Sequence, residues 1–548
     1  MFVPVRSNIR DKKIIEKVLL LFFVVFLAIA SYCHEPWFDE AQAWQIARSA
    51  SYKDLLLVLP HYEGHPPFWH LLLSIPAKLG APYELSLKAI AFVPVVCMAT
   101  FILLKSPFPR VLRCTLPFSY FFFYHYAVLS RPYSFLVFSF VLLASLFKER
   151  NEKPVRFVAG LAFVCMWSAY GIIFAGGIAL AWCIDILMEK IKGKDKSVFT
   201  DRRVLSLGVL LVFALVLIVE IIPDSSVEAL RDPGKSGVSV INILSIFFGT
   251  ISECLLTDRL NNRPSEYTLS DIIDVTPAIL IGIILIALII LLSRKDRIKY
   301  YLIPYLLFSA FATTVYFYGH HMGVMLAFTV FYMWTAFEVP DEERIYRTLF
   351  KEQLKEIKNP ELMRKLLSIC VLTVMSVSVN WGISSAIVDI KYEYFYGRNL
   401  AKFMLDHNME HAFIFGPWNQ SLADDGSVNQ DIHLSKYFVG VLPYFDKDAR
   451  VANLNMGDPE KAYTIHKPLS KQDVEKTLDA WREMGYPEVC TMSTELEVLF
   501  DDFPQYVPVY KIGNTTIWKG EFYYLGTDYL CVREDKLADF GATAIEVE

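Results

Sequence analysis

Residues 34–73 read HEPWFDEAQAWQIARSASYKDLLLVLPHYEGHPPFWHLLL, and this stretch decides how the rest of the chain is interpreted. It directly follows a hydrophobic run and mixes Trp and Leu clusters with titratable side chains: Asp39, Glu40, His61, Glu63, His65 and His70. A surface loop does not need so many aromatic residues, and a buried core does not accommodate so many titratable groups. Both features suit a hydrated cavity at a membrane face, so we interpret the stretch as one wall of a reactive site.

The composition places the chain in the membrane class. Of its 548 residues 54% are hydrophobic and only 20% are charged. Several runs reach the roughly 20 apolar residues that a helix needs to cross a bilayer. The formal net charge of −5 argues against nucleic acid as a partner. The first run, Ile14 to Tyr32, is interpreted as an uncleaved transmembrane helix; a cleaved signal peptide is the alternative, because Ala28-Ile29-Ala30 resembles a cleavage site.

Clusters of Lys and Arg orient the predicted spans, because basic loops stay on the cytoplasmic side. With the basic N-terminus inside, about eleven spans alternate across the bilayer and every basic cluster falls on the same side. The predicted membrane domain is residues 1–388, with outer loops at 34–83 and 223–274. Residues 389–548 then lie on the extracytoplasmic side.

The tail, residues 389–548, differs from the membrane part in charge, with 15 Lys and Arg against 27 Asp and Glu. Short apolar-aromatic runs alternate with helical patterns, which predicts a small α/β domain. The predicted strands are 411–418, 437–444 and 506–518, and the predicted helices are 394–406 and 471–484. Cys490 and Cys531 lie in this tail and can pair if it is extracytoplasmic; the sequence leaves both states open.

Four polar segments that are distant in sequence fall on the outer side of this topology. They are Asp39-Glu40, the HYEGHPP stretch at 61–67, Arg131-Pro132-Tyr133 and His320-His321. Polar groups near hydrocarbon are expensive, so we expect them to share a functional site.

Each of these segments also has a purely structural interpretation. Asp39 can cap a helix over 40–48, Arg131 can snorkel to the interface, and His320-His321 can begin an interfacial helix. Pro66-Pro67 predicts the start of a helix over 68–79.

A metal centre is a weaker alternative. A zincin-like pair needs two His one turn apart on a single helix, and Gly64 and the two prolines interrupt any helix here. A divalent-cation site built from Asp39, Glu40 and His65 stays open. No other cofactor is predicted.

The chemistry follows from what the chain lacks and where its polar groups lie. No Walker A loop, dinucleotide fingerprint or nucleophile elbow occurs, and a reaction at the outer face has no ATP. An activated donor must therefore arrive in the membrane, which indicates a lipid-linked donor with a phosphate leaving group. Arg131 and the histidines suit an anion, and the Asp39 carboxylate can accept a proton from an attacking hydroxyl.

The motifs WFDEAQAWQIA, YEGHPPFWHLLL, YAVLSRPYSFLVF and YGHHMG, taken in this order, resemble the multi-spanning GT-C glycosyltransferases. They are most similar to the bacterial branch related to protein O-mannosyltransferases and lipid A aminoarabinose transferases. The resemblance covers about residues 14–388 and does not extend into the tail. It implies a mainly α, polytopic GT-C fold and a polyprenyl-phosphate sugar donor used on the outer or lumenal side. The acceptor-recognition elements of the protein mannosyltransferases are absent, so protein O-mannosylation is not implied.

The resemblance also implies roles at matching positions. Asp39 matches the acidic residue that acts as base or orients the acceptor, and Glu40 matches its partner, so both are assigned as catalytic. Glu63 and His65 lie in the segment that matches the donor-contacting element. Residues that match the phosphate-holding elements are Arg131, Tyr133, His320 and His321.

The sequence thus predicts an integral membrane glycosyltransferase, in a bacterial plasma membrane, that moves a sugar from a polyprenyl-phosphate donor to a hydroxyl acceptor. The acceptor is a glycan, a lipid or a protein. A lipid or glycan transporter or flippase is the first alternative, and it needs polar residues that continue through the helices. A non-catalytic membrane scaffold that displays the acidic tail is the second.

Overall fold

In the computed structural model the chain is mainly helical, with a small sheet near its C-terminus. The structure describes residues 14–193, 197, 200–223, 239–260, 269–315, 317–337, 345–352, 360–415, 420–422, 428–430, 436–445, 451–452, 483, 485–493 and 505–546.

Six helices are long and apolar enough to cross a membrane, among the residues that the structure describes. Each coincides with a hydrophobic run that the sequence predicted to span the membrane. They are α1 (Ile14–Cys33), α6 (Tyr83–Lys105), α10 (Ala169–Lys192), α11 (Arg202–Ile221), α14 (Ile272–Leu292) and the Ser368–Lys391 part of α19 (Pro360–Lys391). The chain therefore has the helices of a membrane protein.

The other predicted spans coincide with shorter helices. They are α8 (Tyr133–Leu146), α9 (Pro154–Cys165), α15 (Lys299–Thr314) and α16 (Met322–Phe337). Even the 16 residues of α16 extend only about 24 Å, less than a typical hydrocarbon core. The run through 118–126 is divided between a 3-10 turn, η2 (Leu116–Phe118), and a π-helix, η3 (Tyr120–His125). Six spans are supported, and the number eleven stays a prediction.

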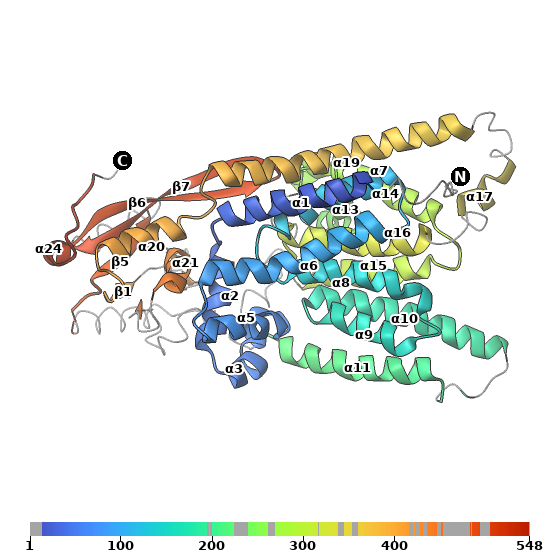
Figure 1. The fold of residues 1–548 in the computed structure, drawn as a ribbon, viewed down its shortest axis with the longest axis horizontal. Coiled ribbons are helices and arrows are strands. Elements are labelled where there is room, and N and C mark those ends of the chain that lie inside the picture. The colour runs from blue at the N-terminus through green and yellow to red at the C-terminus, as the bar shows by residue number, and fades with distance from the viewer. Residues whose placement is uncertain are drawn as a thin grey trace.

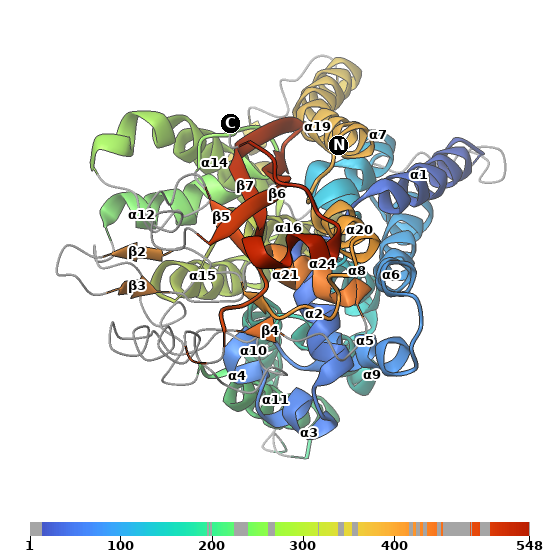
Figure 2. The same ribbon diagram turned by 90° about the vertical axis from the view of Figure 1, so that its left-hand side faces the viewer.

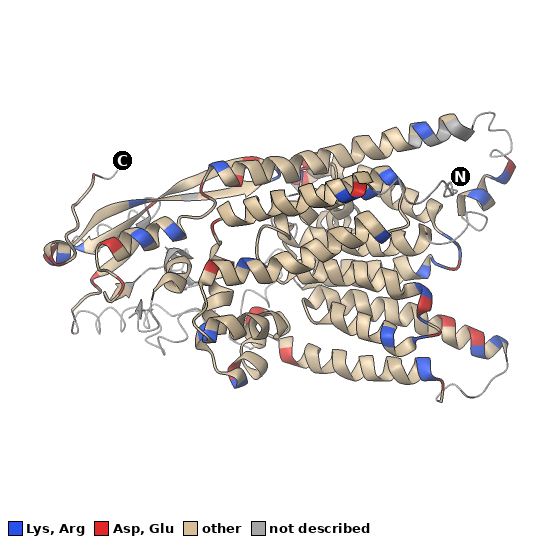
Figure 3. Ribbon diagram, in the orientation of Figure 1, with Lys and Arg blue, Asp and Glu red and all other residues tan. Residues whose placement is uncertain are grey.

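The long helices lie roughly parallel in one bundle, and the sheet lies beyond one end of it (Figure 1). Helices of the first predicted loop lie at that same end, and Figure 2 shows the bundle from this side. They are α2 (Phe38–Ser49), α3 (Tyr52–Leu57), α4 (Pro60–Glu63) and α5 (Phe68–Lys78). Lys and Arg gather at the opposite ends of many bundle helices, toward the right of Figure 3. This asymmetry is the charge pattern on which the predicted orientation depends.

The predicted outer loop 223–274 is not a simple loop. It contains α12 (Val240–Leu244), a π-helix η6 (Ser245–Gly249) and α13 (Thr250–Glu253), which pack against α14. A side chain at Gly282 of α14 would meet the Phe248 carbonyl, so glycine is required for this close approach. The helical run Val240–Glu253 is apolar but too short to span a bilayer.

The tail contains a five-stranded sheet in the order β4-β1-β5-β7-β6. The β4, β1 and β5 strands are parallel, whereas β5, β7 and β6 are antiparallel. Their bounds are β1 (Ile414–Phe415), β4 (Val451–Ala452), β5 (Val489–Ser493), β6 (Tyr506–Trp518) and β7 (Glu521–Arg533); a separate hairpin joins β2 (Gln420–Leu422) to β3 (Val428–Gln430).

The predicted strand 506–518 is confirmed as β6, and the predicted strand 411–418 contains β1. The predicted helix 394–406 corresponds to α20 (Gly397–Asp406), whereas 471–484 lies almost entirely outside the described residues.

The predicted strand 437–444 is wrong. This segment forms α21 (Lys436–Val441) and a 3-10 turn, η11 (Leu442–Tyr444), packed against α2. Arg48 of α2 donates to the carbonyls of Leu442 and Phe445 at 3.0 and 2.9 Å, and satisfies backbone acceptors that a helix leaves free at its end. A short apolar run has no clear period, so its packing on α2 decided its conformation.

The cysteines of the sheet provide a test of sidedness. Cys490 of β5 and Cys531 of β7 are direct cross-strand partners, and both thiols are buried. In an oxidising compartment we expect them to form a disulfide by losing two hydrogens to a thiol–disulfide oxidant. Intact-mass analysis after alkylation under non-reducing conditions should show both thiols protected, whereas Cys370 on α19 is exposed and should be alkylated. Alkylation of Cys490 and Cys531 in the denatured, unreduced chain would contradict an extracytoplasmic tail.

Candidate functional site

The site is centred on an ion pair between Asp39 and Arg131. Asp39 lies in the first turn of α2, and Arg131 lies just before α8, so two segments 92 residues apart meet here. The Arg131 Nη1 donates to Asp39 Oδ2. The side chains are 22% and 16% exposed, so the pair is mostly buried but still open to a ligand. The structure therefore brings together the two residues that the sequence assigned as base and anion binder.

Glu40, the neighbour of Asp39, has a different environment. Its side chain is fully buried. One carboxylate oxygen accepts from the Ser130 backbone N–H at 2.6 Å, and the other accepts from the Trp37 N–H at 2.9 Å and from the His34 ring at 3.0 Å. Glu40, not Asp39, thus caps α2, and the same carboxylate ties α2 to the turn that carries Arg131.

His34 extends this network to the last helix of the bundle. Its other ring nitrogen contacts Asp389 Oδ2 on α19 at 2.8 Å, and Tyr124 donates to the same oxygen at 3.0 Å. Burial alone would lower the pKa of His34, but the carboxylates of Asp389 and Glu40 raise it to about 10. Burial would likewise raise the pKa of Glu40, but protonated His34 and the two backbone donors lower it. His34 is therefore an imidazolium held between two carboxylates.

Glu63 is the last residue of α4, and His65 lies in the short segment between α4 and α5. Gly64 joins them in a left-handed conformation with φ of 64°, which turns the chain at the end of α4. Pro67 then caps α5, which begins at Phe68 as predicted and ends at Lys78. The local geometry thus comes directly from the Gly-His-Pro-Pro sequence.

Burial and the charges of the Asp39–Arg131 ion pair shift the pKa values of Glu63 and His65. Burial, together with the charge of Asp39, raises the pKa of Glu63 to about 7, and Arg131 opposes this shift. Burial and the charge of Arg131 lower the pKa of His65 to about 3. Glu63 and His65 therefore belong to the same electrostatic site as Asp39 and Arg131.

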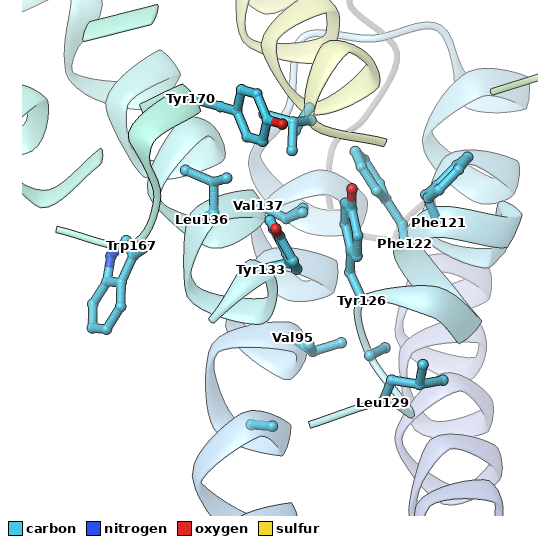
Figure 4. Packing of buried hydrophobic residues seen from close by; sticks show 14 of the residues in the cluster. Val95, Phe121, Phe122, Tyr126, Leu129, Tyr133, Leu136, Val137, Trp167 and Tyr170 are labelled. Atoms are coloured by element: carbon cyan, nitrogen blue, oxygen red, sulfur yellow. The ribbon is translucent and has the colours of Figure 1, made fainter. Parts of the chain in front are cut away.

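Tyr133 connects Arg131 to the two distant histidines. Its ring stacks on Tyr126 with centroids 4.9 Å apart (Figure 4) and meets the edge of His321 at 5.8 Å and of His65 at 6.2 Å. Tyr126 also donates to the His320 carbonyl at 2.7 Å. His320 and His321 lie in the short 3-10 turn η9 (Gly319–His321) that precedes α16. All four predicted polar segments thus meet at one place.

The histidines around Arg131 are neutral, in contrast to His34. Burial and the positive charge of Arg131 lower the pKa of His70 to about 4 and hold those of His320 and His321 well below the ordinary value. For Arg131, burial opposes protonation, but Asp39 raises the pKa above its ordinary value. The sequence grouped Arg131 and the histidines as anion binders. In the structure their roles differ, because Arg131 supplies the positive charge and the imidazoles can supply hydrogen bonds.

Two polar atoms beside Arg131 are buried without a hydrogen-bond partner among the described residues. They are His65 Nδ1 and the Tyr133 hydroxyl. A buried polar group without a partner is destabilising, and it is common where a ligand supplies the missing contact. Together with Arg131 these atoms can bind an anion that also accepts two neutral hydrogen bonds.

The proposed divalent-cation site is not assembled. In the part of the chain that the structure describes, no group of three or more His, Cys, Asp or Glu side chains could hold a metal ion. Glu40 directs both oxygens into its own hydrogen-bond network, so Asp39, Glu40 and His65 do not converge as ligands.

Sequence reasoning missed His34 and Asp389, which have no motif and join only because α1 and α19 lie side by side. It also did not single out Tyr126, whose hydroxyl donates to the His320 carbonyl. A His directly after a hydrophobic run was the one available signal for His34. A scan against protein-family models gave no match, and a search of curated proteins found no relative.

The pKa of Glu63 predicts a pH dependence for anion binding. Below about pH 7 Glu63 is protonated, and above it the carboxylate adds one negative charge beside Asp39 and Arg131. A short-chain prenyl phosphodiester of a sugar, whose own charge is constant in this range, should therefore bind more weakly as the pH rises from 6 to 8.

Glu63→Gln mimics the protonated form and should bind the probe with a flat profile at the tighter level. Isothermal titration calorimetry in detergent measures the affinity of both proteins for the probe at each pH. An unchanged slope in Glu63→Gln would assign the pH dependence to another group.

Proposed function

We propose that this protein is an integral membrane glycosyltransferase of the GT-C type that uses a polyprenyl-phosphate sugar. The observation that carries the proposal is the Asp39–Arg131 ion pair. Its carboxylate belongs to α2, a helix at the tail-side end of the apolar bundle (Figure 1), and lies directly against a permanent cation. Transfer of a sugar from a phosphate needs both groups: a base for the acceptor and a positive charge for the leaving group.

In the proposed reaction the acceptor hydroxyl oxygen attacks the anomeric carbon as the bond from that carbon to the phosphate oxygen breaks. The acceptor proton passes to Asp39, and the electron pair leaves with the lipid phosphate. Arg131 contacts Asp39 through Oδ2, which leaves Oδ1 for the acceptor. Direct displacement on the opposite face from the phosphate inverts the configuration of the sugar.

The leaving phosphate is stabilised by one charged and several neutral groups in this proposal. Arg131 can share its guanidinium donors between Asp39 and the phosphate, which suits its planar, multi-donor geometry. His65 Nδ1 and the Tyr133 hydroxyl, which have no hydrogen-bond partner among the described residues, can donate to the same phosphate. His320 and His321 add imidazole groups that are uncharged, so the site does not hold the phosphate product too tightly to release it.

The catalytic assignment of Glu40 changes to a positioning role in this proposal. Its buried carboxylate has no oxygen free for a substrate. It fixes α2 to the Ser130 turn and so determines where Asp39 meets Arg131. Transport without transfer remains the competing function, and the assay below separates the two.

Asp39→Asn should lower transfer by about 10²–10⁴-fold, the usual contribution of a general base. Its melting temperature should fall less than that of Glu40→Gln, because the Asp39–Arg131 pair is partly exposed whereas Glu40 is fully buried. The full chain is reconstituted in liposomes with a mixture of polyprenyl-phosphate hexoses and pentoses and with extracted envelope glycolipid. Mass spectrometry then follows released polyprenyl phosphate and the glycosylated product. Full activity of Asp39→Asn would exclude it as the base, and donor translocation without release would support the transporter alternative.

Glu40→Gln is the matched control, because it replaces the adjacent carboxylate by the same isostere. It removes a buried charge opposite His34, and disrupting such a pair costs about 3–5 kcal/mol. We therefore expect a larger fall in melting temperature than for Asp39→Asn, together with lower transfer. Equal melting temperatures for Glu40→Gln and the unmodified protein would contradict the positioning role of Glu40.

A further inference from the structure

The β6–β7 hairpin of the tail extends back to the membrane bundle. Its two strands are 13 residues long, and both contact α19. In Figure 1 they run beside the end of that helix, away from the rest of the sheet. The hairpin tip, residues 518–520, is therefore placed inside the bundle end rather than in solvent.

The backbone of the tip is specialised for this contact. Lys519 and Gly520 form a two-residue turn with φ of 49° and 91°, a conformation that usually selects Asn-Gly. A side chain at Gly520 would approach the Ser384 Cβ on α19 to 2.9 Å, so glycine is needed for space as well as for conformation. Lys519 adopts a left-handed conformation that lysine seldom takes.

The Lys519 side chain is buried at 1% exposure in a site with complementary charge. Its ammonium lies 2.6 Å from Glu253 Oε1 and from the Thr257 carbonyl, and 3.1 Å from Asp258 Oδ1. It also lies over the Trp381 ring at 4.7 Å. All three ammonium hydrogens therefore have acceptors, and the acceptors belong to the segment around α13.

Trp518 makes the second contact between the hairpin tip and the bundle. Its indole N–H donates to Asp258 at 3.0 Å, and its ring packs at 5.5 Å from Tyr120 and 5.7 Å from His125. These two residues begin and end the π-helix η3. A π-helix is a departure from regular helix geometry that is frequent at functional sites, and here its conformation is supported by a side chain from the tail.

Both contacts of the tip lead to the His320-His321 turn. The His125 ring lies 6.5 Å from that of His320, and the next residue, Tyr126, donates to the His320 carbonyl. On the other side Cys254, adjacent to Glu253, donates to the Met322 carbonyl at 3.1 Å. The tip thus contacts the two segments that hold the turn.

We propose that the hairpin tip of the tail positions the histidine side of the transferase site, by inserting Trp518 and Lys519 between η3 and α13. The inference rests on the proposed function for its catalytic consequence. Trp518 and Lys519 are positioning residues, because their contacts are with His125, Tyr120 and the α13 segment and not with Asp39 or Arg131. The tail is then an obligatory part of the membrane enzyme.

The test uses the full chain in liposomes with Trp518→Ala, and Tyr524→Ala as the matched control. Tyr524 is an exposed aromatic residue of the same hairpin. Hydrogen exchange read by mass spectrometry should rise in peptides covering 120–126 and 317–322 for Trp518→Ala and stay unchanged for Tyr524→Ala. The kcat for sugar release should fall by about 10²-fold with little change in donor KM, because displaced groups mainly affect the reacting geometry.

Trp518→Phe keeps a ring against His125 and should recover most of the lost kcat. Lys519→Met should raise exchange in the same two peptides. Exchange and kcat in Trp518→Ala equal to those of the unmodified protein would overturn the inference. The exchange measurement does not need turnover, so it still decides the inference if the unmodified protein transfers no sugar and the proposed function fails.

Discussion

The buried charge of Glu40 is the constraint on which the architecture of the site depends. A carboxylate out of contact with water is stable only when its oxygens are fully hydrogen-bonded and its charge is balanced. Glu40 meets this condition through Ser130, Trp37 and His34, and His34 in turn requires Asp389. Because these partners come from the start of the chain, the α8 turn and the last bundle helix, satisfying one charge fixes three distant segments together.

The position of Asp39 is a consequence of that network. It lies one position before Glu40 in the first turn of α2, so fixing Glu40 directs Asp39 toward Arg131. Burial, together with the positive charge of Arg131, lowers the pKa of His65 and of His70 and keeps both imidazoles neutral. The result is a site in which the permanent cation of Arg131 lies beside the Asp39 carboxylate. Two buried polar atoms of the site, His65 Nδ1 and the Tyr133 hydroxyl, have no hydrogen-bond partner among the described residues. Such a site suits a ligand whose charge moves during reaction, as in the loss of a phosphate from a sugar.

The sequence predicted the parts of this structure that depend on local signals. Hydrophobic runs located the long helices, Pro66-Pro67 located the start of α5, and an apolar-aromatic run located β6. It also identified Asp39 and Arg131, because charged residues at an apolar boundary are conspicuous. It could not predict the His34–Asp389 contact or the insertion of Trp518, since these depend on how helices and tail pack. The run 437–444 was misassigned for the same reason: its contact with α2, not its own pattern, determines its helical form.

The central claim is that Arg131, His65 and Tyr133 form one binding site for the phosphate of a lipid-linked sugar beside Asp39. Electron cryomicroscopy of the protein with a non-hydrolysable prenyl phosphonate sugar tests it most directly. We expect the phosphorus in hydrogen-bond reach of Arg131, His65 and Tyr133, with the sugar toward Asp39 and the prenyl chain along the apolar bundle. A phosphonate bound elsewhere, with Asp39 and Arg131 still enclosed by protein alone, would contradict the account.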